Sequence, residues 1–214
     1  MRGNDARKFT QSVEEITGIL EQARSYATGQ NTYVWVAFYP LDPSTLAGPD
    51  KDQSGSQLYV ATYASTDGTD PVNWGNPLSS VSIPYPSAAS PSIIQIAKVK
   101  VFKQLQVAQS PFSSEQIPAM PSAMNSPTAP SSAVAFSLPL RSPSLVLSQQ
   151  TPPTGAQAIL VIGFTPSGSA QVSPALAAEI GLDLEPVRGG VTDTNNIVAL
   201  RISGLVGLTT IYRK

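Results

Sequence analysis

Two residue types that carry much of protein chemistry are absent: the 214-residue chain has no cysteine and no histidine. Without cysteine there are no disulfides and no thiolate metal ligands. Without histidine the chain lacks the commonest general base, the commonest metal ligand and every histidine-dependent catalytic triad. These absences argue against a hydrolase. We expect a protein that is not an enzyme and that uses no cofactor and no metal.

Charge and long apolar runs are also scarce. Charged residues make up 13% of the chain, against a usual quarter, and the formal net charge is −1. This balance gives no overall field that would attract nucleic acid or an anionic membrane. No apolar run reaches the roughly 18 residues that span a bilayer. Low charge with much serine, threonine and proline favours an extracytoplasmic or fibre-associated protein over a cytosolic enzyme.

Catalytic motifs are missing too. The chain has no G-x-S-x-G elbow, no S-x-x-K, no phosphate-binding glycine loop and no H-E-x-x-H motif. Acidic pairs occur at Asp50/Asp52 and Glu14/Glu15, but carboxylates this close in sequence are usually solvated charges rather than a glycosidase pair.

The clearest feature that is present is an amphipathic helix over residues 5–28. Its apolar side chains recur at alternating steps of four and three, which places them on one helical face. This face consists of Phe9, Val13, Ile16, Leu20, Ala23 and Ala27. Asn4 or Asp5 can cap its start, and Gly29 lies where a left-handed residue would end it.

Strands are predicted after the helix. Residues 32–39 are rich in β-branched and aromatic residues, and residues 57–65 alternate like a half-buried strand. The two should pair as an antiparallel hairpin with a long loop. The apolar run 157–165 predicts a central strand, and residues 197–203 and 208–213 predict a closing hairpin.

Two further segments allow alternatives. Residues 93–107 predict a strand with a bulge or, less in keeping with their β-branched density, a helix. Lys98, Lys100 and Lys103 in this segment are typical of a solvated edge strand. Residues 174–180 predict either a short helix or a loop that crosses the sheet.

A Pro/Ser-rich insertion occupies residues 108–154. Nine of the chain's 20 prolines lie in it, and their fixed φ and missing N–H argue against continuous regular structure. Short strands at 134–140 and 144–148 remain compatible with the sequence. Apolar residues recur too often for a solvated linker.

Three stretches, taken in order, resemble a known family. Leu20–Ala27 (LEQARSYA), Asn31 and the following YVWV resemble the "L-x-x-A-R-x-x-A … N … V-x-V" signature of minor pseudopilins of the type II secretion H kind and their FimT-kind relatives of type IV pili. Phe164–Ala170 (FTPSGSA) is similar to the family's "F-x-P-x-G-x-A" segment, and residues 197–213 are similar to its final "hydrophobic–Gly–hydrophobic" hairpin. The likeness is greatest to the prepilin-like Verru_Chthon cassette proteins.

The resemblance implies an α+β, pilin-like fold. A long N-terminal amphipathic helix would pack on antiparallel β-sheets, and the C-terminal strands would complete a second layer. We expect one domain, 1–214, with helix 5–28 and a β-domain over 32–214. The helix would be the soluble half of a longer one, whose apolar first half anchors the protein in the inner membrane.

The implied function is that of a non-enzymatic minor pilin or pseudopilin. Such a subunit assembles with sibling pilins into a type II secretion or type IV pilus-like filament of the cell envelope, with its β-domain in the periplasm. The helix face of Phe9, Val13, Ile16 and Leu20 would bind these partners. The sequence does not tell which helix residues face the sheet and which face neighbours.

A DNA-binding minor pilin for DNA uptake, or a soluble extracytoplasmic binding module, is the alternative. FimT-kind relatives bind DNA through basic residues near the C-terminal hairpin. Where they place arginines, this chain has Leu-Thr-Thr at 208–210, which leaves Arg201, Arg213 and Lys214 as candidate nucleic-acid contacts. Because several cations are normally needed, this departure argues against a nucleic-acid partner.

A calcium loop is the last candidate site. The segment 183–196 offers the hard oxygen ligands that Ca²⁺ prefers. They are Asp183, Glu185, Asp193, Asn195 and Asn196. An Asx-rich turn, whose side chains bond to their own backbone, is the plainer interpretation.

Overall fold

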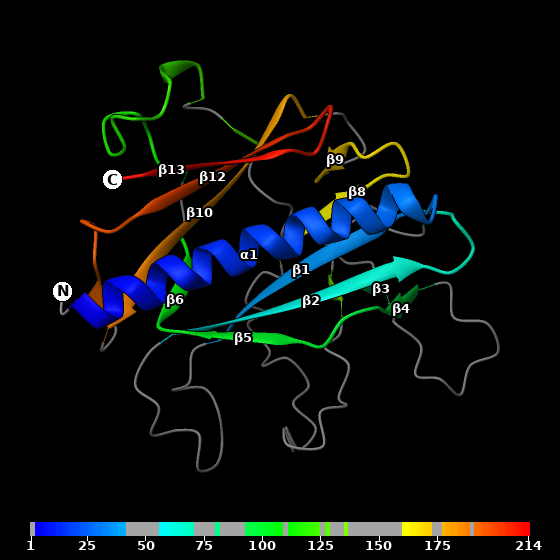
Figure 1. The fold of residues 1–214 in the computed structure, drawn as a ribbon, viewed down its shortest axis with the longest axis horizontal. Helices are drawn as coiled ribbons and strands as arrows, with labels where there is room; N and C mark the ends of the chain where they lie inside the picture. The colour runs from blue at the N-terminus through cyan, green and yellow to red at the C-terminus, as the bar shows by residue number, and fades with distance from the viewer. Residues whose placement is uncertain are drawn as a thin grey trace, which may run out of the picture.

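The computed structural model describes residues 3–41, 56–70, 80–81, 93–108, 111–124, 127–128, 135–136, 160–172, 177–188 and 191–214. In this part of the chain, one long α-helix lies across two antiparallel sheets (Figure 1). The predicted α+β class is therefore confirmed.

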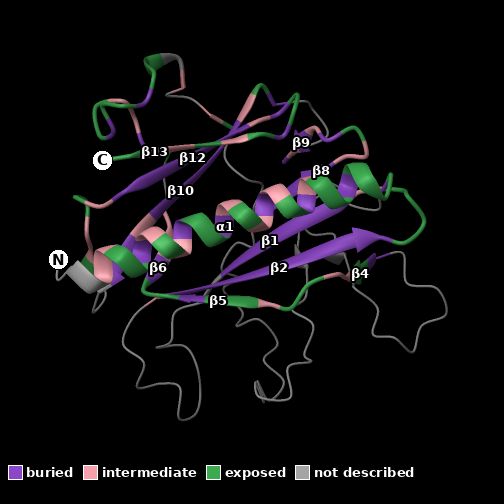
Figure 2. Ribbon diagram, viewed as in Figure 1, coloured by how far each residue is buried: buried purple, intermediate pink, exposed green. Residues whose placement is uncertain are grey.

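Helix α1 spans Gly3–Gly29 and matches the predicted helix. Its stripe of apolar side chains is buried along its whole length, and the polar side chains between them face solvent (Figure 2). The left-handed residue that follows the helix is Asn31, with φ 50°, and not Gly29. Asparagine tolerates this conformation because its short polar side chain can bond locally.

The first sheet, called sheet 1, has the order β4-β2-β1-β8-β9, and β5 also pairs with β2. Its strands are β1 (Val34–Leu41), β2 (Gln57–Ser65), β4 (Ile93–Gln95), β5 (Lys100–Lys103), β8 (Leu160–Phe164) and β9 (Ala170–Gln171). β1 lies in the middle, with Val36 opposite Thr62 of β2 and Ile162 of β8. The predicted hairpin of β1 and β2 and the central strand β8 are confirmed.

The second sheet, called sheet 2, has the order β11-β10-β12-β13, and β6 also pairs with β10. Its strands are β6 (Leu105–Val107), β10 (Glu179–Arg188), β11 (Val191–Thr192), β12 (Val198–Ser203) and β13 (Thr209–Arg213). The predicted closing hairpin is β12 and β13. A small parallel pair, β3 (Ser80–Val81) with β7 (Ala135–Phe136), and a 3₁₀ turn at Ser122–Met124 complete the described elements.

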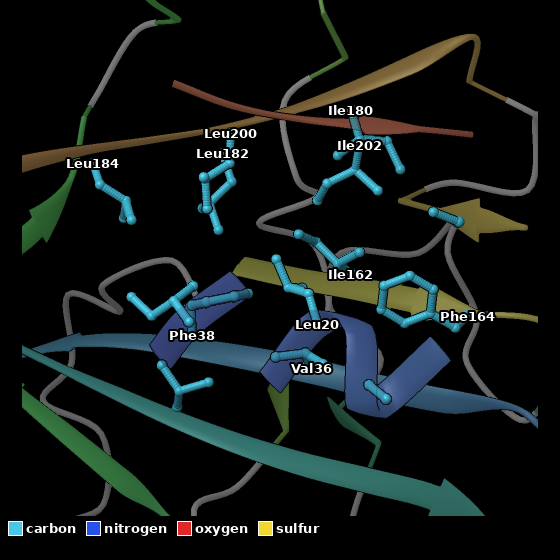
Figure 3. Close-up of a cluster of buried hydrophobic side chains, with 14 of the residues drawn as sticks. Leu20, Val36, Phe38, Ile162, Phe164, Ile180, Leu182, Leu184, Leu200 and Ile202 are labelled. Carbon is cyan, nitrogen blue, oxygen red and sulfur yellow. The ribbon is translucent and has the colours of Figure 1, made fainter. Parts of the chain in front are cut away.

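The main core lies where α1 and the inner faces of both sheets meet. Leu20 of the helix lies close to Val36 and Phe38 of sheet 1 on one side, with Ile202 of sheet 2 on the other (Figure 3). Burying one such aliphatic side chain contributes about 1.5–3 kcal/mol. The helix therefore joins the two sheets through a shared apolar layer.

Residues 93–107 form strands, and the helix alternative is wrong. The expected bulge is instead a change of sheet: β5 pairs with β2 in sheet 1, whereas β6 pairs with β10 in sheet 2. Gln104 between them has φ 59° and turns the chain from one sheet to the other. Lys100 on β5 is exposed, as predicted, and contacts Glu15 of the helix at 2.7 Å.

Two other expectations need correction. The strand 57–65 is buried on both faces rather than on one, because Tyr59 and Tyr63 belong to a second apolar cluster on the outer face of sheet 1. The proposed helix at 174–180 is wrong at its end, since Glu179 already pairs with Ser203 in the sheet. The expected strand at 144–148 and the pair Asp50/Asp52 lie outside the described residues.

Candidate functional site at the end of the helix

Arg24, in the last turns of α1, connects the helix to sheet 2. Its Nε donates a hydrogen bond of 2.7 Å to the carbonyl oxygen of Val206, in the turn between β12 and β13. One turn earlier, the Glu21 carboxylate accepts a hydrogen bond of 3.1 Å from the backbone N–H of Thr209. The helix thus satisfies backbone groups at the start of the last strand.

Two glycine turns meet beside Arg24. Gly168 (φ 85°) lies in the turn between β8 and β9, and Gly207 (φ 66°) lies in the turn between β12 and β13. A Cβ atom on Gly207 would come within 2.3 Å of the Gly168 carbonyl oxygen. Next to them, the Ala170 N–H donates to the Gly204 carbonyl oxygen at 2.9 Å. Only glycine combines this backbone conformation with such a close approach.

The junction of Arg24, Gly168 and Gly207 unites the three motifs noted in the sequence. Arg24 belongs to the helix motif, Gly168 to the FTPSGSA motif, and Gly207 to the closing hairpin. Arg24 bonds to Val206, next to Gly207, and Ala170 of the second motif bonds to Gly204 of the hairpin, although the three motifs are far apart in the chain. The sequence contained this signal only as three separate patterns.

The outer surface of this junction is partly apolar. Leu205, Val206 and Leu208 on the hairpin turn are all exposed, Leu205 to 66%. On the neighbouring turn the hydroxyl groups of Thr165, Ser167 and Ser169 bond to one another at 2.6–3.1 Å. The end of the domain at the C-terminus of α1 therefore presents apolar and hydroxyl-bearing turns on a fixed backbone.

The helix face expected to bind partners points inward. Phe9 is 8% exposed, and Val13, Ile16 and Leu20 are completely buried against the two sheets. The expectation that these residues contact other subunits is therefore wrong for the folded domain, because their apolar surface is already covered. The exposed side of the same helix carries Gln11, Gly18, Gln22 and Ser25.

Arg201, one of the candidate nucleic-acid contacts, does not lie on the surface. It is 1% exposed on the outer face of sheet 2, where it pairs with Asp183. Arg213 and Lys214 are exposed, but Arg213 bonds to Thr10 at 3.2 Å, and Lys214 bonds to the Thr194 carbonyl oxygen at 3.2 Å. The three cations do not form a common surface for phosphates.

The candidate calcium ligands also lie in different environments. Asp183 is buried with Arg201, and burial raises the pKa of its carboxyl group, while the hydrogen bonds from Arg201 and Phe112 act to lower it. Asp193 accepts from the backbone N–H of Asn195 at 3.0 Å, which is the Asx-turn arrangement. Among the described residues, no group of three acidic side chains could hold a metal ion.

Sequence reasoning missed the Asp183–Arg201 pair. Both residues were assigned to solvent-facing roles, yet each alternates with large apolar residues, Asp183 between Leu182 and Leu184. That alternation indicates a strand with one apolar face, and it does not tell that the face of Asp183 and Arg201 is covered as well.

No protein family, no curated protein and no solved structure matches this chain. Within the ranges that the structure describes, no helix is both long and apolar enough to cross a membrane.

Proposed function

We propose that this protein is a non-enzymatic assembly subunit of the minor pilin or pseudopilin kind, which acts in a type II secretion or type IV pilus-like filament of the cell envelope. The observation that carries the proposal is the junction of Arg24, Gly168 and Gly207. Three motifs that resemble those of one family make direct contacts with one another, as parts of one inherited structural unit would.

The arrangement of the helix supports the same proposal. Its apolar stripe is buried in the domain, so a neighbour would meet the opposite side, where Gln11, Gly18, Gln22 and Ser25 are exposed. Arg7 and Glu14 are exposed on this side as well, so a neighbouring helix would meet small, amide and charged side chains together. The N-terminus of α1 and the hairpin turn of Leu205 lie toward opposite ends of the domain (Figure 1). If subunits packed side by side along α1, the hairpin turn would stay exposed and could contact another subunit.

The absence of cysteine makes a direct test possible. In cells that produce the native protein, single variants Gln11→Cys and Gln22→Cys would be exposed to a short thiol cross-linker, with Ala97→Cys, an exposed position in the bend between β4 and β5, as the control. We expect cross-linked species in the envelope fraction from the two helix variants and little from the control.

Cross-linking that is equal at all three positions would indicate random collisions. A protein that stays monomeric, or that is found in the cytosol, would refute the assembly role.

A further inference from the structure

The outer face of sheet 2 is covered by residues 111–124, here called the strap. Phe112, Ile117 and Met120 of the strap are buried in one cluster with Ala199 of β12 and with Ile197, which precedes β12. These residues form an apolar cluster that is separate from the main core. The strap is therefore the only described segment of the Pro/Ser-rich insertion with a cluster of its own.

A buried ion pair fastens the start of the strap. Arg201 of β12 and Asp183 of β10 pair through two contacts, one of them 3.2 Å between Nη2 and Oδ2. The same two side chains bond to both backbone groups of Phe112: its N–H donates to Asp183 at 2.5 Å, and its carbonyl oxygen accepts from Arg201 at 3.1 Å. The ion pair thus binds the strap as well as joining two strands.

Beyond Phe112 the strap bonds mainly to itself. The N–H groups of Ile117, Met120 and Met124 donate to carbonyl oxygens inside the strap at 2.9–3.0 Å. The next backbone bonds to sheet 2 come after the strap, at Thr128, which pairs with β10 at Ile180. Between these two attachments, the apolar side chains of Ile117 and Met120 hold the strap to the sheet.

We propose that the strap opens from sheet 2 as a unit while the rest of the domain stays folded, with the Asp183–Arg201 pair as its clasp. Segments with few backbone bonds to their surroundings open at a lower free energy than the core. The clasp contributes to that free energy, because Phe112 of the strap is bonded to both charged side chains while they are buried. If Asp183 loses its charge, Arg201 is left buried without its bonded carboxylate and with Glu179 as a remaining acidic neighbour, and opening the strap is the shortest way to hydrate it.

Thiol labelling under native conditions measures this opening. Ala199→Cys places the only thiol of the chain beneath the strap, and Ala23→Cys places one on the buried face of α1 as the control. Each is combined with Asp183→Asn. We expect labelling at position 199 to accelerate about tenfold or more, which corresponds to about 1.4 kcal/mol for a buried guanidinium that loses its bonded carboxylate, while labelling at position 23 stays slow.

Two further variants keep the test decisive if Asp183→Asn fails to fold. Phe112→Ala loosens the strap and leaves the ion pair intact, and should accelerate labelling only at position 199. The double variant Asp183→Leu/Arg201→Met removes both charges and should restore slow labelling.

Unchanged labelling at position 199 in Asp183→Asn would refute the clasp. Equal acceleration at positions 199 and 23 would show that the domain opens as a whole and would overturn the strap as a separate unit. Because labelling uses the monomer, neither result depends on the assembly role proposed above.

Discussion

The space between α1 and the two sheets is filled by apolar side chains, whereas the outer faces of the same sheets bury polar groups. The outer face of sheet 1 holds Tyr39 and Tyr63, whose hydroxyl groups bond at 3.1 Å. The outer face of sheet 2 holds Asp183 and Arg201. The inner layer contributes stability through apolar area and close packing, and it needs no polar partner. The outer layers require particular partners, because a buried polar group is stable only when it is bonded.

The largest effect should follow from placing a charge in the inner layer. Val13→Asp puts a carboxylate among apolar side chains with no partner, so we expect it to destabilise the domain by more than Leu20→Ala, which should cost about 2–5 kcal/mol. Urea unfolding of both variants measures the difference. If Val13→Asp left stability unchanged, the helix would not be docked on the sheets in solution.

The second effect concerns the tyrosine pair and alkaline pH. Burial raises the pKa of Tyr63 to about 12, against the opposing hydrogen bond from Tyr39, and burial also raises the pKa of Tyr39. Above pH 10 the unfolded tyrosines lose their protons while the folded pair keeps them, so the pair's contribution is present below pH 10 and is lost as pH rises toward 12.

We therefore expect the free energy of unfolding to fall between pH 10 and about 12, and to fall less in the double variant Tyr39→Phe/Tyr63→Phe. Urea unfolding at several pH values, together with the ultraviolet absorbance of tyrosinate, would follow both processes. Ionisation of all seven tyrosines near pH 10 in the folded protein would contradict the buried pair.

A smaller effect should come from Gly181, opposite Arg201 on the outer face of sheet 2. A Cβ there would come within 2.6 Å of Pro127 Cγ, so Gly181→Ala should cost about 1–3 kcal/mol through overpacking. Gly18→Ala, in open space on α1, should instead stabilise by up to about 1 kcal/mol. Thermal unfolding compares the two, and a loss in both would mean that overpacking is not the cause.

The sequence predicted the inner layer better than the outer layers. Local periodicity predicts the following elements, because the sequence of each one contains the pattern of its buried residues: helix α1 and strands β1, β2, β8, β12 and β13. The outer layers depend on contacts between distant segments. Arg201 can be either exposed to solvent or buried beside Asp183. The outcome depends on what covers sheet 2, and no local pattern carries that information.

The candidate site was likewise predictable only in part from local patterns. The motifs of Arg24, Gly168 and Gly207 were visible, but their contact was not, since 182 residues separate Arg24 from Val206. The inward direction of Phe9 and Ile16 was also undetermined, because an apolar stripe looks the same whether it meets the chain's own sheet or another subunit.

The bond between Glu21 and Thr209 has a consequence for biosynthesis. The two residues are 188 positions apart, so the 187 residues between them are translated before the partner of Glu21 exists. Until then α1 has made its turns without the last strand that closes over it, and its apolar stripe is only partly covered. The newly made helix would therefore be exposed to chaperones and to other apolar surfaces while the intervening residues are synthesised, and β13 completes its cover.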